Sequence, residues 1–273
     1  METLVREALR NAGSYCDLFF ENTSIWSLML KDGEVTSGGY HRDYGCGIRV
    51  LDGEKTGYAY SESTDMPSLL CAARAASVIG ETRDVRKGFN KIDIHTTNDF
   101  YPMKKDLREE SPSVLVELLQ QLDKTIRNAD SRVFKVIASL SYSISEIMMY
   151  NSLDELTEDL RPLCSLNVSV VFKQGDDLQT KSASKSLRMG AEFYNETLTK
   201  ELTDELTSGV DAMFEARRPR GGQMNVVMSA GASGILLHEA MGHAFEADFN
   251  RKGQSVFSDK MGCQVCPKGI NIV

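Results

Sequence analysis

Long apolar stretches are missing from this sequence. No uncharged apolar run approaches the length of a helix that crosses a membrane. Residues 1–13 follow an amphipathic helical pattern with charges throughout, and they lack the apolar core and cleavage site of a signal peptide. These absences argue against a membrane protein or a secreted one. They predict a soluble, intracellular protein that has no membrane partner.

Basic clusters are scarce as well. Against a formal net charge of −8, the densest basic run is Arg-Arg-Pro-Arg at 217–220, which has the character of a linker. Proteins that bind nucleic acid need a basic surface to neutralise phosphates. The sequence therefore predicts no direct contact with nucleic acid.

The six cysteines are scattered, without the density or spacing of a disulfide framework. Cys16, Cys71 and Cys164 lie among apolar residues, which predicts small buried side chains. Cys263 and Cys266 form a Cys-x-x-Cys pair that could bind a metal, but one pair without a second is weak support for a metal site. A surface loop with incidental thiols is the simpler interpretation.

The sequence does contain enough apolar residues, 41% of 273, for a substantial core in more than one folding unit. Residues 1–106 predict an α+β domain in which a helix at 2–12 precedes an antiparallel meander. The Asp-Gly pairs at 32–33 and 52–53 are hairpin signals, and 81–110 predict a connecting segment. The expected strands are 15–21, 23–33, 34–53 and 54–63, and a helix is expected after them at 66–80.

Residues 107–219 predict a second α+β domain in the same order, a helix followed by several strands. Ser111 is a candidate N-cap for its first helix, and Pro112 takes the first helical position. The last helix of this domain is expected at 194–216. The similarity to the first domain is architectural only, because no clear sequence repeat connects them.

Residues 220–273 predict the start of a third, mainly β domain, in which a short buried strand at 224–230 leads into a helix at 233–248. The fold class is therefore α+β, two helix-plus-antiparallel-sheet units followed by this third domain. The chain stops on Ile-Asn-Ile-Val at 270–273, a run of strand composition. We expect either a fragment or a last strand that pairs with something outside the chain.

Two of the four histidines occur in the stretch LLHEAMGHAFEADF, Leu236 to Phe249. His-Glu followed by a second histidine on a helix is typical of zinc peptidases, in which the histidines bind the ion and the glutamate is the general base. Here His238 and His243 are spaced at i, i+5, so on an ideal helix they diverge by about 140°. They need a local distortion to meet on one ion. Gly242 permits one, either a π-turn or the start of unwinding.

A simpler alternative is an ordinary amphipathic helix. Leu237, Met241 and Phe245 recur at helical spacing and would form its core stripe, with the histidines flanking it as boundary residues. The spacing alone leaves both interpretations open. The context favours the metal site, because a predicted strand and a glycine-containing turn precede the helix, an arrangement that suits the wall of a cleft.

The stretch LLHEAMGHAFEADFNRKGQSVF closely resembles the zinc-helix signature of the TldD branch of the TldD/PmbA metalloprotease family, once called modulators of DNA gyrase. That signature is His-Glu-x-x-x-His followed by Glu-x-Asp. The runs DLFFE, DGEV, GCGIRV and GYAYSES resemble the first domain of the same family. The resemblance runs through most of the chain, although about 107–219 match by pattern rather than by motif.

The resemblance implies a zinc-dependent peptidase of the cytoplasm that acts on extended or unfolded peptides, in peptide maturation or antitoxin degradation. His238 and His243 correspond to zinc ligands and Glu239 to the catalytic base. The family's third ligand is a cysteine of the far C-terminal domain, beyond Val273, so we expect the site to be incomplete in this chain. The implied partner is a PmbA-type (TldE-type) subunit without the zinc motif, or a further copy in a homo-oligomer. The rival interpretation is a non-catalytic peptide-binding or assembly subunit of the same family.

Two further expectations concern the surroundings of the motif. Glu246 lies between the two histidines in angular position on an ideal helix, and a ligating imidazole usually needs its other N–H held by an acceptor. We therefore expect Glu246 to support a histidine rather than to bind the metal. We also expect the substrate to lie as an added β-strand beside this helix, because backbone hydrogen bonds suit peptides of any sequence.

Overall fold

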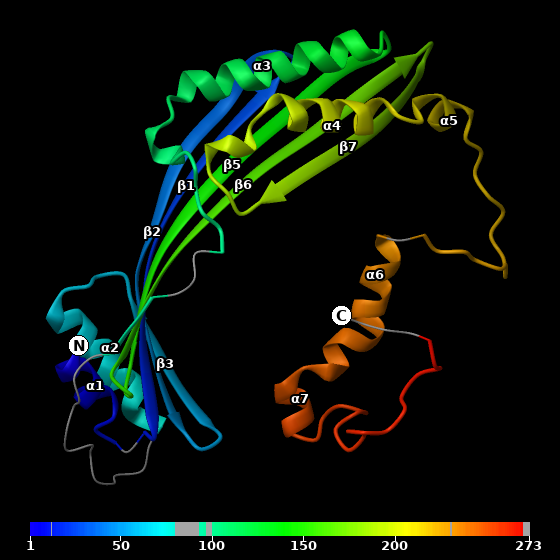
Figure 1. Ribbon diagram of the computed structural model, residues 1–273. Helices are drawn as coiled ribbons and strands as arrows, with labels where there is room; N and C mark the ends of the chain where they lie inside the picture. The colour runs from blue at the N-terminus through cyan, green and yellow to red at the C-terminus, as the bar shows by residue number, and fades with distance from the viewer. Residues whose placement is uncertain (12, 80–92, 97–99, 230, 270–273) are drawn as a thin grey trace. The chain divides into compact units, whose positions relative to one another are not determined.

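The computed structural model describes the chain except for residues 12, 80–92, 97–99, 230 and 270–273 (Figure 1). The chain divides into two compact units, Met1–Ala216 and Arg217–Val273, and each is described by itself. Within the described residues, no helix combines the length and the apolar character needed to cross a membrane. The strand expected at 270–273 lies outside the described residues.

The first unit is built on one seven-stranded sheet (Figure 1). The order across the sheet is β3-β2-β1-β5-β6-β4, and β7 also pairs with β6. Every neighbouring pair is antiparallel except β4 and β6, which are parallel. The strands are β1 (Tyr15–Lys31), β2 (Glu34–Asp52), β3 (Lys55–Ser61), β4 (Asp93–Thr96), β5 (Val133–Asn151), β6 (Glu155–Gln174) and β7 (Asp177–Leu187).

Strand β1 joins the two halves of this unit, because it pairs with β2 on one side and with β5 on the other. The prediction of separate strands at 15–21 and 23–33 is wrong, since β1 is continuous. Both neighbours run unbroken past this point, so a break in β1 would leave their backbone groups unpaired. The hairpin at 32–33 is confirmed, with positive φ at Asp32 (52°) and Gly33 (82°). The α+β class with an antiparallel sheet is confirmed, with the strands of both predicted units in one sheet.

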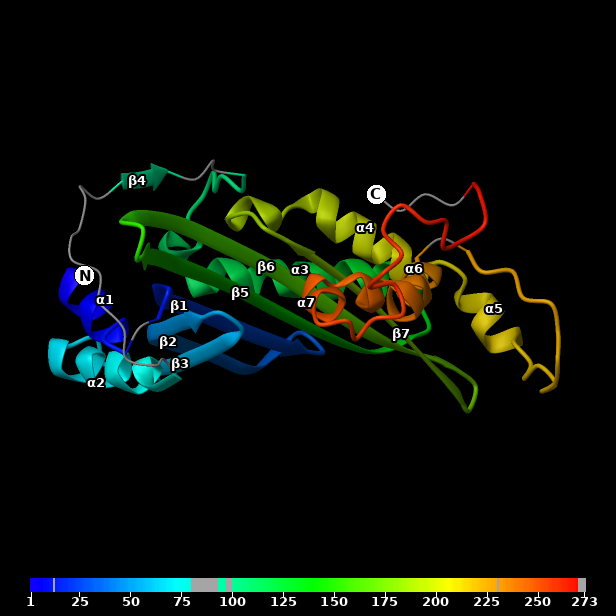
Figure 2. The ribbon, with the colours of Figure 1, turned by 90° about the horizontal axis from the view of Figure 1, so that it is seen from below.

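Helices cover two separate parts of one face of this sheet. At one end α1 (Glu2–Ala8) lies beside α2 (Met66–Ala76), and at the other end α3 (Pro112–Ala129) lies beside α4 (Glu196–Thr207) (Figures 1 and 2). In β1, Leu18 belongs to the core under α1 and α2, and Leu30 to the core under α3 and α4. Leu18, Leu30 and the other even-numbered positions of β1 point to the same face. The two cores therefore share that face at its two ends.

Ser111 occupies the N-cap position of α3 and Pro112 opens the helix, as predicted, but the Ser111 hydroxyl makes no cap hydrogen bond and lies 2.8 Å from Ser113 Oγ. A second predicted helix differs from the structure. The single helix expected at 194–216 is divided into α4 and α5 (Val210–Glu215). The division falls at Gly209, whose left-handed backbone, φ 69° and ψ 14°, cannot continue a right-handed helix.

In the second unit, short helical pieces occupy 232–251, where one helix was expected at 233–248. They are α6 (Ala232–Leu237), the π-helical turn η4 (His238–Gly242), the 3₁₀ turn η5 (His243–Phe245) and α7 (Ala247–Arg251). None of the described residues of this unit is buried. Its side chains therefore form no core of their own among the described residues.

The buried strand predicted at 224–230 is wrong over its described part. Residues 224–229 form no strand, and Val227 is 98% exposed. A strand needs neighbours that pair its backbone N–H and C=O groups. The described residues of the second unit contain no other strand that could supply them.

Candidate metal centre

The histidine motif lies where the helix changes its winding. In η4 the backbone N–H of His243 donates to the carbonyl oxygen of His238. An i→i+5 hydrogen bond is the defining contact of a π-turn. Of the two distortions expected at Gly242, a π-turn or the start of unwinding, the structure has the π-turn. The wider turn returns the second histidine to the side of the first, whereas an α-helix would turn them about 140° apart.

Three polar side chains of the motif meet on this turn. The ring centroids of His238 and His243 lie 4.5 Å apart, with the planes inclined by 61°. Glu239 Oε2 lies 3.7 Å from His243 Nε2. One possible ligand atom from each of the three residues lies within 4.8 Å of the other two. We call these three residues the candidate metal centre, because nitrogen and oxygen donors this close can converge on one small cation.

Gly242 leaves room for the first histidine. A Cβ atom at Gly242 would lie 2.9 Å from Nδ1 of His238 and 3.5 Å from its Cγ. The backbone of Gly242 is ordinary right-handed helix, φ −56° and ψ −51°, which any residue can adopt. Glycine therefore acts here through the side chain that it lacks, and not through conformational freedom.

Glu246 holds the second histidine. Its Oε1 lies 2.6 Å from Nδ1 of His243, at hydrogen-bond distance. This hydrogen bond raises the pKa of His243 above its ordinary value, because a carboxylate favours the charged imidazole. In the neutral ring the contact places the proton on Nδ1, so that the lone pair of Nε2 remains for another partner. The chain thus brings Glu246 to the position expected of a residue that supports a ligand.

Two later residues, which sequence reasoning missed, hold the chain after His243. Asn250 Nδ2 donates to the carbonyl oxygens of Ala244 and Glu246, both at 2.9 Å. Ser255 Oγ donates to the carbonyl of Ala244 at 2.5 Å. Carbonyls at a helix end need donors from outside the helix. Polar residues soon after the motif were the signal that could have identified them.

The core stripe of the alternative interpretation is not buried in the described structure. Leu237 is 37% exposed and Phe245 is 48% exposed. Phe245 stacks on Phe257 with centroids 4.6 Å apart and planes inclined by 4°. An ordinary amphipathic helix owes its stability to a buried apolar face. The exposed stripe therefore gives that interpretation no support.

The other two histidines lie in the sheet of the first unit. On β2, His41 Nε2 lies 2.7 Å from Asp43 Oδ1, and His95 is a residue of β4. Cys263 is exposed and Cys266 is half-buried, and neither belongs to the candidate metal centre among the described residues.

All six cysteines are free thiols. Cys16 and Cys164 are buried as predicted, and burial raises the pKa of each thiol to about 12, which keeps it protonated and unreactive. The prediction for Cys71 is wrong, because it is exposed. The buried stripe of α2 includes Leu69 and Ala72, and Cys71 lies off that stripe.

Comparison with known proteins places this motif in a family. Three family models match the chain in order: PmbA/TldA metallopeptidase domain 1 at 16–79, the central domain at 105–210, and the C-terminal domain at 221–273. The chain belongs to the PmbA/TldD metallopeptidase family. The candidate metal centre falls within the third match.

Curated relatives carry protease names. A "Metalloprotease TldD homolog" of Haemophilus influenzae is 34% identical over 261 residues, which are 92% of this chain and 53% of that relative. A "Metalloprotease" of Methanothermobacter thermautotrophicus is 27% identical, and the match covers 95% of this chain and 56% of that relative. The chain thus spans about half the length of the curated relatives it matches. The family is one of metal-dependent proteases.

Solved structures share the fold. One from Thermotoga maritima, described as a modulator of DNA gyrase, has a TM-score of 0.66 at 15% identity. The match covers 95% of this chain and 58% of the Thermotoga chain. TldE from Thermococcus kodakarensis has a TM-score of 0.64 at 16% identity, and the match covers 95% of this chain and 58% of TldE. At these identities the likeness shows the fold alone.

Proposed function

We propose that this chain is the metal-binding part of a zinc-dependent peptidase that cuts extended or unfolded peptides in the cytoplasm, in peptide maturation or antitoxin degradation. The observation that carries the proposal is the candidate metal centre, in which donor atoms of His238, Glu239 and His243 lie within 4.8 Å of one another. Zinc is the proposed ion because neutral imidazoles with a nearby carboxylate suit it. Membership of a metallopeptidase family supports the reaction class.

The residues of the centre have distinct proposed roles. His238 and His243 hold the ion, His243 through Nε2 because Glu246 occupies its Nδ1. When bound, zinc supplies Lewis-acid activation of water and of the peptide carbonyl. Glu239 is the general base: its carboxylate takes a proton from the attacking water and delivers it to the amine that leaves as the peptide bond breaks.

This chain by itself should bind zinc weakly and show little peptidase activity. Two imidazoles leave a tetrahedral zinc site short of a protein ligand. The measurement is the zinc content of the purified chain after dialysis against a chelator, beside a protein of the full length of the curated relatives. Stoichiometric zinc retained by the short chain would refute the expectation and point to Cys263 or Cys266 as substitute ligands.

In a protein of full length, Glu239→Gln should abolish hydrolysis of an unfolded peptide while zinc stays bound. Glutamine keeps the shape of glutamate but cannot accept the proton of water. His238→Ala should instead lose the metal itself. Near-normal turnover by the Glu239→Gln variant would remove Glu239 from the role of base.

Substrates are proposed to bind as an added β-strand beside the helix that carries the histidines. Backbone hydrogen bonds would then recognise any extended chain, so folded proteins should resist cleavage and their unfolded forms should not. A proline moved stepwise along the substrate should block cleavage wherever it removes a needed N–H. Cleavage that tolerates proline at every position would exclude strand addition.

A second candidate function is a non-catalytic peptide-binding or assembly subunit. It is favoured by the candidate metal centre itself, which offers only two imidazoles among the described residues. The His-Glu-x-x-x-His motif favours the enzyme instead. A TldE-type subunit or a further copy of this chain is the proposed partner, and one solved structure with this fold is a TldE. Zinc analysis and peptidase assays with and without such a subunit separate the two functions.

A further inference from the structure

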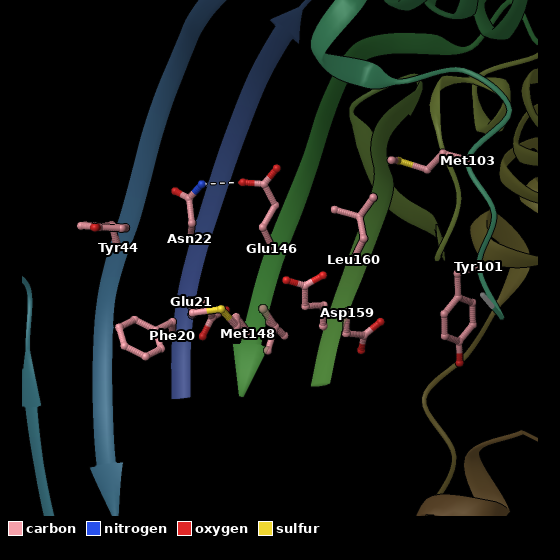
Figure 3. A pocket seen from close by; sticks show the side chains of 12 residues that line it. Phe20, Glu21, Asn22, Tyr44, Tyr101, Met103, Glu146, Met148, Asp159 and Leu160 are labelled. Atoms are coloured by element: carbon pink, nitrogen blue, oxygen red, sulfur yellow. Dashed lines mark hydrogen bonds between the residues drawn. The ribbon is translucent and has the colours of Figure 1, made fainter. Parts of the chain in front are cut away.

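The sheet face that carries the two cores of the first unit has a groove between them. Its volume is about 550 Å³, the size of pockets that hold small ligands or a few residues of peptide (Figure 3). The floor consists of side chains from β2, β1, the end of β5 and the start of β6. In the observed register they form two rows across the sheet: Tyr44, Asn22, Glu146 and Leu160, and then Phe20, Met148 and Glu158.

One side of the groove is formed by the segment that precedes α3. Tyr101 and Met103 of that segment line the groove beside β6, and Figure 3 shows both beyond Leu160. Phe20 on the floor packs against the core under α1 and α2, and Met103 packs against the core under α3 and α4. The groove is therefore bounded by both cores and belongs wholly to the first unit.

The lining is apolar and acidic. No lysine, arginine or histidine occurs among the described residues that line it, whereas carboxylates do. Glu146 and Glu158 lie in the two rows on this face, and Glu21 and Asp159 occupy the alternate strand positions between those rows. Arginine and lysine side chains suit such a surface, because their apolar stems cover apolar groups while their charged ends reach carboxylates. An acidic ligand would be repelled.

Arginines of the chain itself already make contacts of this kind at the groove. Arg108 donates to Oε1 of Glu146 at 2.8 Å. The guanidinium of Arg42 lies 5.6 Å from the ring centroid of Tyr44. Both carboxylates and aromatic faces attract guanidinium groups. Glu146 and Tyr44, two lining residues on different strands, thus already contact guanidinium groups.

The positions of two carboxylates fix a spacing. Glu146 lies opposite Leu160, so Glu158, two residues along β6, is its diagonal neighbour. Diagonal neighbours on adjacent antiparallel strands lie about 7–8 Å apart. In an extended peptide, residues i and i+2 point to the same side and lie roughly 6.6 Å apart. Two basic residues separated by one other residue therefore match Glu146 and Glu158.

We propose that this groove binds an extended peptide in which two arginine or lysine residues are separated by one residue. The proposal rests on the proposed function in one respect, since it takes the ligand to be a peptide. It adds a substrate class: the groove holds a basic stretch of the peptide that the enzyme processes.

The test is a fluorescence anisotropy titration of a labelled Ala-Arg-Ala-Arg-Ala peptide with the intact chain at low salt, where exposed ion pairs are least screened. The double variant Glu146→Gln/Glu158→Gln should bind it about tenfold more weakly, because hydrogen bonds to charged groups are lost. The control Glu34→Gln/Glu201→Gln changes two exposed carboxylates outside the groove. It makes the same change in net charge and should bind like the wild type.

Two further peptides test the chemistry. Ala-Glu-Ala-Glu-Ala should not bind, and Ala-Ala-Arg-Arg-Ala, with adjacent arginines, should bind more weakly than the alternating peptide. If the double variant does not fold, the single variant Glu158→Gln replaces it in the test, because Glu158 is exposed. Its affinity for the alternating peptide should also fall.

Several results would overturn the proposal. They are no binding by the wild type, equal weakening in the control variant, and equal binding of the acidic peptide. Dimerisation that depends on Glu146 and Glu158 without peptide binding would assign the groove to a second copy of the chain. A zinc titration of the same samples reports the candidate metal centre separately, so failure of the groove and failure of the metal site are distinguished.

Discussion

Gly242 shows how an absent side chain can set the geometry of a site. A methyl group at Gly242 would press on the imidazole of His238, with 2.9 Å between Cβ and Nδ1. Gly242→Ala should therefore displace that ring and weaken zinc binding about tenfold, the scale of changes to groups that support a metal ligand. The measurement is a zinc titration followed by competition with a chelator.

Gly234→Ala is the matched control for that prediction. Gly234 lies in α6 of the same unit, and a Cβ there would meet no atom within 4 Å. Alanine also favours a helix over glycine, so zinc affinity should not fall. An unchanged affinity in Gly242→Ala, or an equal loss in both variants, would show that the contact with His238 does not matter.

Glu246 links zinc binding to pH. Zinc needs neutral imidazole, so protons compete with it. Because the hydrogen bond from Glu246 raises the pKa of His243, the charged ring persists to a higher pH than in an ordinary histidine, whose pKa is about 6.5. As pH falls, zinc affinity should therefore begin to decline above the pH expected for an unperturbed histidine.

Glu246→Gln should move that decline to lower pH. Glutamine carries no charge and so no longer favours the protonated ring. At pH 8 the same variant should bind zinc about 10–100-fold more weakly, because a neutral amide orients and polarises the imidazole less well. Zinc titrations across a pH series measure both effects. A decline at higher pH than in the wild type, or an unchanged affinity at pH 8, would remove Glu246 from this role.

At the scale of the elements, Gly57 lets β3 approach α2 closely. A Cβ atom at Gly57 of β3 would lie 2.0 Å from the carbonyl oxygen of Ala76 at the end of α2. Gly57→Ala should therefore force the two elements apart and lower the free energy of unfolding by about 1–3 kcal/mol. Gly39→Ala on β2 is the control, since its nearest neighbour would be Ser27 Oγ at 3.4 Å. Urea denaturation curves that coincide for the two variants would contradict this packing account.

Local features of the elements were predictable and distant pairings were not. The Asp32-Gly33 hairpin follows from residue type, and the i, i+5 histidines with Gly242 between them predict a local distortion of the helix, for which the π-turn was one of two possibilities. The pairing of β4 with β6 escaped prediction, because Asp93 and Glu155 are partners far apart in sequence. The same limit applies to the pairing of β1 with β5, which merges the strands into one sheet. For the candidate metal centre, the spacing of the histidines left two interpretations open and the family resemblance favoured the metal site, whereas the contacts of Asn250 and Ser255 depend on how the chain turns back.

The whole molecule divides into a unit with two cores and a unit in which no described residue is buried. Backbone amides in buried strands exchange slowly with solvent, and those in exposed segments exchange fast. Hydrogen exchange followed by mass spectrometry should therefore protect peptides of β5 far more than peptides of 217–269, where no described residue is buried. Zinc should slow exchange around 238–246 and leave β5 unchanged. Equal protection in both units, or a zinc effect confined to β5, would contradict this division.

The most direct test of the central claim is a calorimetric zinc titration of this chain and four variants. The account predicts one weak site in the wild type, which is lost in His238→Ala and in His243→Ala. The site should remain in Glu239→Gln, because that residue is assigned to the proton and not to the metal. It should also remain in His41→Ala, whose histidine lies on β2 beside Asp43. Zinc binding that survives both His238→Ala and His243→Ala, or that disappears in His41→Ala, would contradict the account.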